Sequence, residues 1–341
     1  MRLPAASLAL IAALLCAACG AGRGPAAVPA PRDASVVLDF TPNAVHAGIY
    51  AAIARHLDRA NRLRLHVVVP SATTDAVKLL ESDRVDFAVL DIHDLALARA
   101  RGEEIVGIMA LVERPLAAVI AGAGIRSPRE LEGRTVGITG VPSDTAVLRS
   151  TVAGAGGDPA RVKTITIGFN AVADLLAARV SAATAFWSDE GVALSARSRG
   201  FHSFRVDRYG APAYPELVLC TSAQSLRRNG SVAAALVRTL VEGYAFTLTD
   251  PRRSAADLES LVPGLDPKLV AAQLSALLPA FRAPDGAIGT LDSGVLHRWS
   301  AWEARFGIVS RPPDVPSMFD PAYAAAARRA GMPAAGGGGD R

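Results

Sequence analysis

The sequence predicts an α/β protein built as two lobes. Along its first third, short apolar runs of the kind that form strands buried on both faces alternate with helically spaced segments. A stretch rich in Gly, Ser, Pro and charged residues at 122–132 interrupts that alternation, and a second series of such units follows it. One further apolar run at 217–221 then predicts that the chain returns to the first sheet.

In the first lobe, predicted to comprise residues 35–122 and 216–320, the apolar runs predict strands at 35–40, 64–69, 86–90, 105–112 and 117–121. Helical spacing predicts helices at 47–57, 75–80 and 93–101. After the return strand at 217–221, Leu, Val and Phe recur at core spacing in helices at 232–249, 254–261, 267–278 and 290–306.

In the second lobe, predicted to comprise residues 123–215, a strand at 135–139 is followed by a loop and a helix at 145–153. Further strand and helix units are expected at 163–168, 172–178 and 182–187. Residues 321–341 pass through Ala and Arg to four consecutive glycines, so we expect a disordered C-terminal tail.

The composition excludes several classes of protein. Half of the 341 residues are hydrophobic and a fifth are charged, which excludes wholesale disorder. The formal charge is only +4, and the basic residues form no continuous run, so nucleic acid is not an expected partner.

The N-terminus predicts export. Met1 and Arg2 precede a short apolar run that ends in small residues, as in a secretory signal, and the Ala-, Gly- and Pro-rich segment after it predicts a flexible tether at 20–34. The stretch 15–20 resembles a bacterial lipobox, which implies that 1–19 is a lipoprotein signal, that Cys19 carries the lipid and becomes the new N-terminus, and that the protein is anchored to the outer face of the cell membrane. A freely secreted protein is the alternative. Cys220 is the only cysteine in the body, so no disulfide is expected there.

Catalytic signatures are absent from the sequence. Outside the predicted signal, where Cys16 and Cys19 happen to form a C-x-x-C, it contains no G-x-S-x-G, H-E-x-x-H, C-x-x-C, Walker or G-x-G-x-x-G pattern, and no two histidines lie four residues apart. We therefore expect no catalytic residue, no metal and no cofactor.

Polar residues at strand ends are the candidate ligand-binding groups. Phe40, Asn43 and His46 follow the first strand, at the sheet edge where ligands bind in open α/β folds. Asn and neutral His each offer a donor and an acceptor, which suits a flat polar heterocycle. Alternatively, Asn43 caps the helix and His46 only packs.

A second cluster, at 186–190, places Trp187 beside Glu190, offering a ring for stacking and an acceptor for N–H groups. A surface Trp beside an N-cap Asp189 is the alternative. We add three further candidates: Asp91, for which helix capping is the alternative, Ser143 at a helix start, and Tyr214 at the return to the first lobe.

Five stretches in register resemble the NMT1/THI5-like family of bacterial solute-binding lipoproteins: 38–50, 85–88, 131–137, 168–170 and 209–214. The resemblance implies a periplasmic-binding-protein-like (type II) fold, with a ligand cleft between two α/β lobes. It also implies a monomeric binder that delivers a thiamine pyrimidine precursor, a hydroxymethyl- or formylaminomethyl-pyrimidine, to an ABC permease.

In that family pattern Phe40, Asn43 and His46 line the pocket from the first lobe, and Trp187, Glu190 and Tyr214 complete it. Riboflavin or another flat ring is an alternative cargo. Fungal relatives are pyrimidine-forming enzymes that need a lysine after the third strand and a cysteine-rich run. This sequence has neither, so the resemblance implies a binder and not an enzyme.

Overall fold

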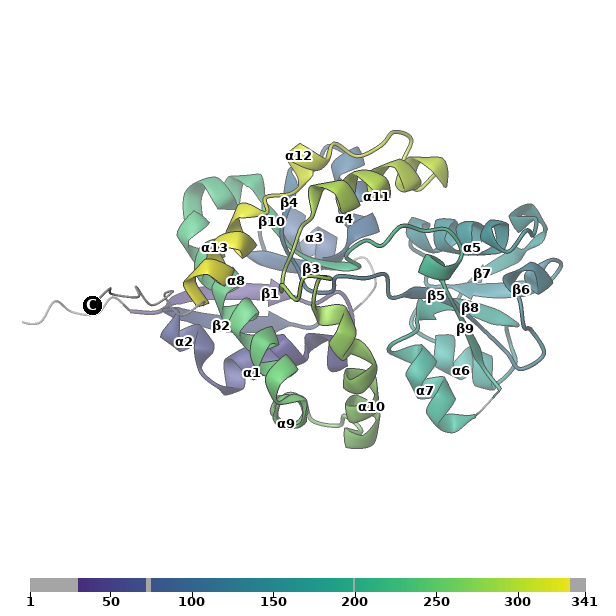
Figure 1. Cartoon of the computed structure of the whole chain (residues 1–341), viewed down its shortest axis with the longest axis horizontal. Helices are drawn as coiled ribbons and strands as arrows, with labels where there is room; N and C mark the ends of the chain where they lie inside the picture. The colour runs from purple at the N-terminus through teal and green to yellow at the C-terminus, as the bar shows by residue number, and fades with distance from the viewer. Residues whose placement is uncertain (1–29, 72–74, 199, 332–341) are drawn as a thin grey trace, which may run out of the picture. The chain divides into compact units, whose positions relative to one another are not determined.

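The computed structural model describes residues 30–71, 75–198 and 200–331, and these contain two five-stranded mixed sheets (Figure 1). We call the elements packed on them the first and the second lobe. The predicted signal and Cys19 lie outside the described residues. The predicted lobe bounds remain a prediction, except where the strands below correct them.

The first sheet has the order β2-β1-β3-β10-β4. Its strands are β1 (Arg32–Val37), β2 (Leu63–Val68), β3 (Phe87–Asp91), β4 (Ile105–Ala110) and β10 (Leu217–Ser222). β1 pairs in parallel with β2 and β3, whereas β10 lies antiparallel between β3 and β4. The predicted return of the chain to the first sheet is therefore confirmed.

Two limits of the first strand differ from the prediction. β1 begins at Arg32, whose N–H donates to the Arg62 carbonyl at 3.0 Å, so residues 32–34 belong to the sheet and not to a tether. β1 also ends at Val37, opposite Val68 of β2, because the register with β2 runs out there. Phe40 therefore stands in the loop beyond the strand.

The second sheet has the order β7-β6-β8-β5-β9. Its strands are β5 (Ala117–Ala121), β6 (Thr135–Ile138), β7 (Lys163–Thr166), β8 (Ala182–Phe186) and β9 (His202–Arg205). The sequence analysis placed 117–121 in the first lobe, which is wrong, since β5 pairs antiparallel with β8 and β9. An apolar strand does not reveal which sheet it joins, and the chain crosses between the lobes before β5, around Pro115.

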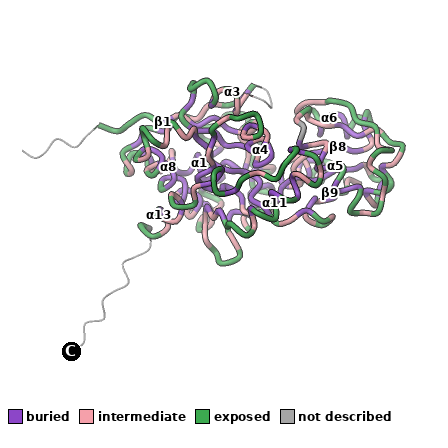
Figure 2. The backbone as a smooth tube through the Cα atoms, turned by 90° about the horizontal axis from the view of Figure 1, so that it is seen from above, coloured by how far each residue is buried: buried purple, intermediate pink, exposed green. Residues whose placement is uncertain are grey.

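Helices cover both sheets (Figure 1). The first lobe carries α1 (Ala47–Ala54), α2 (Leu57–Ala60), α3 (Asp75–Glu81), α4 (Ile92–Ala100), α8 (Ala223–Thr249), α9 (Pro251–Leu261), α10 (Pro267–Leu277), α11 (Ser293–Arg305), α12 (Val315–Met318) and α13 (Ala322–Gly331). The second lobe carries α5 (Pro142–Gly154), α6 (Ala171–Leu176) and α7 (Glu190–Arg197). Figure 2 shows buried segments running through the sheets and exposed segments along many of the connections.

The close packing of α1 against α8 fixes the loop that precedes α1. A Cβ on Gly48 would lie 2.5 Å from Cγ of Tyr244, so only glycine fits at this contact. The Tyr244 hydroxyl donates to the Val45 carbonyl at 2.9 Å, which holds the short 3₁₀ turn of Ala44–His46. Among the described residues α8 is the one helix long and apolar enough to cross a membrane, but half of its most apolar window is buried, as expected of a core helix.

The C-terminal segment corrects another prediction. Residues from 321 were expected to be disordered, yet α13 covers Ala322–Gly331 and packs against α8. Ala324 and Ala327 are buried on its inner face, and the Arg328 guanidinium donates to the Ile288 carbonyl at 2.9 Å. Small apolar residues at helical spacing form this buried face. The prediction missed the helix because it interpreted the Ala-rich composition of the segment as a sign of disorder.

Candidate functional site

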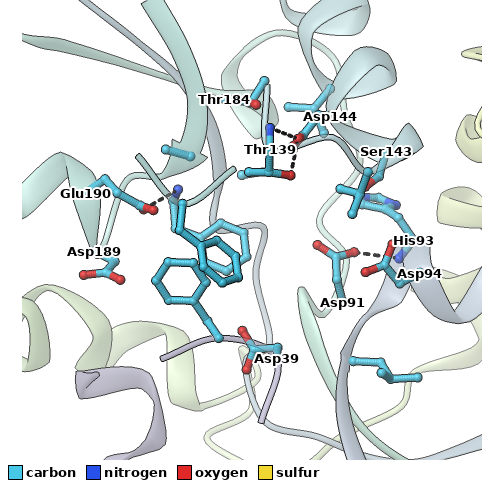
Figure 3. Close-up of a pocket in the computed structure, with 18 of the residues that line it drawn as sticks. Asp39, Asp91, His93, Asp94, Thr139, Ser143, Asp144, Thr184, Asp189 and Glu190 are labelled. Carbon is cyan, nitrogen blue, oxygen red and sulfur yellow. Dashed lines mark hydrogen bonds between the residues drawn. The ribbon is translucent and has the colours of Figure 1, made fainter. Parts of the chain in front are cut away.

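A pocket opens where the ends of strands from both sheets meet (Figure 3). The space between its walls, its open mouth included, is about 840 Å³. Its walls come from the loop after β1, the end of β3 with the start of α4, the loop into α5, the loop after β7, and β8 with the start of α7.

Phenylalanines form the apolar part of the wall. Phe40 meets Phe169 edge to face, with ring centroids 4.3 Å apart and an interplanar angle of 73°, and Phe186 lies at the same pocket. Phe40 belongs to the first lobe and the other two rings to the second. The pocket thus offers aromatic faces on which a flat ring can stack.

Asn43 and His46 do not line the pocket. The Asn43 side chain accepts from the Val45 N–H at 2.9 Å, which is the helix-capping alternative. His46 is fully buried, and its Nδ1 accepts from the Asn43 N–H at 3.2 Å, so Nε2 carries the proton and donates to Asp39 at 2.9 Å. Both residues thereby position Asp39, which does reach the pocket.

Asp189 connects the two lobes beside the pocket. One of its carboxylate oxygens accepts from Nδ2 of Asn43 at 3.1 Å, and the other accepts from Nε2 of Gln273 on α10. Both amides belong to the first lobe, and α10 packs beside α7 (Figure 1). Burial raises the pKa of Asp189 to about 6. The Asp189 side chain makes no capping hydrogen bond to α7, so it serves as a contact between the lobes and not as an N-cap.

Two aromatic side chains that were predicted to bind the ligand also lie outside the pocket. The Trp187 indole N–H donates to the Pro115 carbonyl at 3.0 Å, and the Arg205 guanidinium lies 4.2 Å from the centre of its ring. Tyr214 is fully buried, and its hydroxyl lies 3.1 Å from Nε2 of His93. Neither lines the pocket, and Phe186, which immediately precedes Trp187, takes the place in the wall expected for the tryptophan.

Glu190, at the start of α7, does line the pocket. One of its carboxyl oxygens accepts from the Phe186 N–H at 3.0 Å (Figure 3). Burial, with a further contribution from the neighbouring Asp189 carboxylate, raises the pKa of Glu190 to about 8. At neutral pH this group is therefore mostly a neutral carboxylic acid, with one hydroxyl donor and one carbonyl acceptor.

The opposite side of the pocket is also acidic. Asp91 ends β3 and caps α4 by accepting from the His93 N–H at 2.7 Å, while Asp144 accepts from the Thr139 N–H at 2.6 Å. Asp94, in the first turn of α4, makes no hydrogen bond to any described residue and faces the pocket (Figure 3). Burial raises the pKa of all three carboxyls. Ser143 is buried and lines the same side.

A buried histidine network lies behind this side. The His93 ring contacts Glu303 through Nδ1 and Tyr214 through Nε2, and a Glu216 oxygen lies 3.9 Å from Nε2. Burial alone would lower the pKa of His93, but the Glu303 and Asp91 carboxylates outweigh it and raise the pKa to about 10. His93 is therefore a cation surrounded by carboxylates.

The one cluster among the described residues with metal-ligand geometry is Asp91, His93 and Glu216, whose ligand atoms lie within 4.8 Å of one another. Both ring nitrogens of His93 already have partners, so the histidine offers no free lone pair to a metal. The arrangement favours a charge network over a metal centre.

Most of the polar side chains in the pocket wall are carboxyl groups. Six carboxyl groups line the pocket, and the described lining residues include no Lys or Arg: Asp39, Asp91, Asp94, Asp144, Asp189 and Glu190. An anionic ligand would meet carboxyl groups without a compensating cation, because the one basic group among the described lining residues, His93, is already paired. The wall suits a neutral or cationic ligand that donates hydrogen bonds.

Sequence reasoning missed several of these groups. Asp39, Asp94 and Asp144 each stand within a few residues of a strand end, a signal that was used for their neighbours but not for them. Phe169 lies in the loop after β7, inside a stretch that was noted only for the family resemblance.

Comparison with known proteins identifies relatives of the chain. It is 30% identical over 275 residues to the formylaminopyrimidine-binding protein of Halalkalibacterium halodurans, covering 78% of this chain and 83% of that protein. It is 27% identical over 143 residues to a 4-amino-5-hydroxymethyl-2-methylpyrimidine phosphate synthase of Legionella pneumophila, covering 40% of this chain and 43% of the synthase.

The fold is also found among solved structures. The periplasmic aliphatic sulphonate binding protein of Escherichia coli superposes with a TM-score of 0.68 at 16% identity, over 86% of this chain and 93% of that one. This confirms the periplasmic-binding-protein fold, two α/β lobes about a pocket. The family described as NMT1/THI5 like matches residues 43–254, and together with the identity to the formylaminopyrimidine-binding protein this match shows that the chain belongs to the NMT1/THI5-like family.

Proposed function

We propose that this protein is the extracytoplasmic solute-binding component of an ABC importer, and that it captures a planar aminopyrimidine of the kind that serves as a thiamine precursor. The observation that carries the proposal is the pocket itself, which combines phenylalanine faces with six carboxyl groups and has neither Lys nor Arg in the part of its lining that the structure describes. The 30% identity to a formylaminopyrimidine-binding protein supports the same ligand class. Export through the N-terminal signal and anchoring at Cys19 are part of the proposal.

Glu190 fits the edge of an aminopyrimidine. A 4-aminopyrimidine presents an exocyclic N–H donor beside a ring nitrogen acceptor. A neutral carboxylic acid presents the complementary pair, because its carbonyl accepts from the amine and its hydroxyl donates to the ring nitrogen. Glu190 is held by the Phe186 N–H with its protonated form favoured at neutral pH, so it meets this requirement without the cost of a buried, unpaired charge.

The phenylalanines supply the remaining contacts. Phe40 from the first lobe packs edge to face against Phe169 from the second, so a flat ring that stacks on this pair contacts both lobes. Such a ligand would favour the arrangement in which Asp189 is held by Asn43 and Gln273. No group in this scheme attacks or deprotonates the ligand, and the function is binding followed by delivery.

Calorimetry tests the proposal. Purified protein should bind 4-amino-5-hydroxymethyl-2-methylpyrimidine and its formylaminomethyl counterpart, whereas Glu190→Ala should weaken binding of both by roughly tenfold or more. Glu104→Ala, which removes an exposed carboxylate, is the matched control and should leave binding unchanged. Failure of the wild type to bind either compound refutes the ligand, and equal affinity of the wild type and Glu190→Ala refutes the role of Glu190.

The same samples test the alternative of an enzyme. The relative named as a synthase makes this a necessary control. The bound compound should be recovered unaltered by mass spectrometry after prolonged incubation, because the pocket offers no activated nucleophile. Chemical conversion of the ligand by the wild type would overturn the assignment as a binder.

A further inference from the structure

The side of the pocket opposite Glu190 gathers carboxyl groups, with no Lys or Arg among the described lining residues to pair with them. Figure 3 shows Asp91 and Asp94 facing the pocket across from Glu190 and Asp189. Asp94 makes no hydrogen bond to any described residue, although it is half-buried. A carboxylate in such a place is costly without a partner, so a partner from outside the protein is favoured.

A second, independent observation points to the same place. Glu216 is fully buried, and its Oε1 has no hydrogen-bond partner. Oε1 lies 3.9 Å from Nε2 of His93, and a ligand atom of Glu216 lies within 4.8 Å of those of Asp91 and His93, so this oxygen belongs to the same cluster of carboxyl groups around the histidine. The other oxygen, Oε2, accepts from the backbone N–H groups of Leu116 and Ala117 and is satisfied.

The charge count identifies what is missing. Asp91, Asp94, Glu216 and Glu303 surround a single cation, His93. Nδ1 of His93 contacts Glu303 and Nε2 contacts Tyr214, so both ring nitrogens have partners and neither is hydrogen-bonded to Asp94. Positive charge has to come from protons or from a bound group.

We propose that Asp91 and Asp94, with Glu216 behind them, form a subsite for an ammonium group carried by the ligand. The inference rests on the proposed function and specifies its ligand. The preferred cargo is an aminopyrimidine whose 5-substituent is a protonated aminomethyl group. Its ring pairs with Glu190, and its ammonium reaches the acidic side. An ammonium fits better than a metal ion, because three N–H donors can serve several carboxylates while His93 has no free lone pair.

A ligand series that differs at one substituent tests this subsite. Calorimetry would compare 4-amino-2-methylpyrimidines with hydroxymethyl, formylaminomethyl and aminomethyl groups at position 5. The wild type should bind the aminomethyl compound at least about tenfold more tightly than the hydroxymethyl compound, as expected of a charge-assisted hydrogen bond. Equal or weaker binding of the aminomethyl compound overturns the proposal.

Variants then localise the preference. Asp94→Asn and Asp91→Asn should each reduce the ratio of the two affinities towards one, and both keep the shape of the side chain, since Asn also caps helices well. Asp83→Asn, an exposed position with φ of 52° that Asn tolerates, is the control and should keep the wild-type ratio. A preference that persists in both pocket variants overturns the assignment of the subsite.

Two further outcomes separate the proposals. If the hydroxymethyl or formylaminomethyl compound binds and the aminomethyl compound is not preferred, the ammonium subsite fails and the proposed function stands. If none of the three binds, both fail. Titration with Zn²⁺ alone completes the test, because Zn²⁺ binding that Asp91→Asn abolishes would assign the cluster to a metal and overturn the ammonium proposal.

Discussion

The protonation of Glu190 gives a quantitative prediction for binding. Burial raises its pKa to about 8, so the neutral acid that pairs with an aminopyrimidine dominates at pH 7 and becomes the minor form at pH 9. The protonated fraction falls from about nine tenths to about one tenth over this interval. If only the neutral acid binds, the Kd for 4-amino-5-hydroxymethyl-2-methylpyrimidine rises about tenfold, equivalent to about 1.4 kcal/mol.

Glu190→Gln is the decisive variant. A glutamine keeps the carbonyl acceptor and replaces the acid hydroxyl by an N–H donor, so it can still pair with the amine and the ring nitrogen. Its carbonyl can also accept from the Phe186 N–H, which now bonds to Glu190. The variant should therefore bind the pyrimidine at pH 7 with affinity close to that of the wild type, but its Kd should not change up to pH 9.

Calorimetry at pH 7, 8 and 9 in buffers of equal ionic strength measures both effects. The hydroxymethyl compound is the appropriate ligand, because its 5-substituent does not ionise in this range. A wild-type Kd that is constant between pH 7 and 9 would refute the neutral-acid pairing. An identical pH dependence in Glu190→Gln would also refute it, because another group would then be responsible.

Three further outcomes are expected. Asp189→Ala removes the carboxylate that accepts from the Asn43 and Gln273 amides of the first lobe. The ligand-free variant should therefore show a larger radius of gyration in X-ray scattering and bind the pyrimidine more weakly. An unchanged radius of gyration contradicts the inter-lobe role of Asp189. Gly48→Ala places a Cβ 2.5 Å from Tyr244 and should cost about 1–3 kcal/mol in urea unfolding, whereas Gly124→Ala, with open space around it, should cost little. Glu190→Gln should stabilise the protein relative to wild type more at pH 9 than at pH 6. Because the pKa of Glu190 is higher in the folded than in the unfolded protein, the wild type loses stability as the pH rises from the unfolded-state pKa to the folded-state pKa of about 8. Thermal unfolding of both proteins at pH 6 and pH 9 tests this.

Local sequence patterns were sufficient to predict most strands and helices of the fold. The return of β10 to the first sheet followed from one apolar run placed after a complete second lobe, and the structure confirms it. The assignment of β5 failed, because hydropathy identifies a buried strand but carries no information about its neighbours. The Ala-rich α13 was missed for a related reason, since its small buried face becomes visible only against α8.

The candidate site was predictable in place but not in every side chain. Of the residues predicted at strand ends and helix starts, Phe40, Asp91, Ser143 and Glu190 line the pocket, and ligand binding by them stays a prediction. Asn43, His46, Trp187 and Tyr214 stand at the same strand ends or crossovers, yet their polar atoms are bonded to the protein. A side chain at such an edge can bind a ligand or cap a helix with the same atoms, and only the tertiary structure decides between the two.

The two sides of the pocket differ in how they are placed relative to the crossovers between the lobes. Glu216 lies just before β10, and its carboxylate accepts from Leu116 and Ala117 of the other crossover, so it joins the two segments that connect the lobes. Asp91 lies beside Glu216 and therefore stands next to these crossovers, which we expect to act as the hinge of a lobe rotation.

The aromatic side, in contrast, combines Phe40 of the first lobe with Phe169 and Glu190 of the second. We expect rotation of the lobes to leave the acidic subsite intact while it assembles or separates the aromatic side. A ligand would then meet the hinge carboxylates first, and closure would follow when its ring reaches Glu190 and the phenylalanines. This order predicts that substitutions at Asp94 act mainly on capture, whereas substitutions at Glu190 act mainly on the closed state that a permease would recognise.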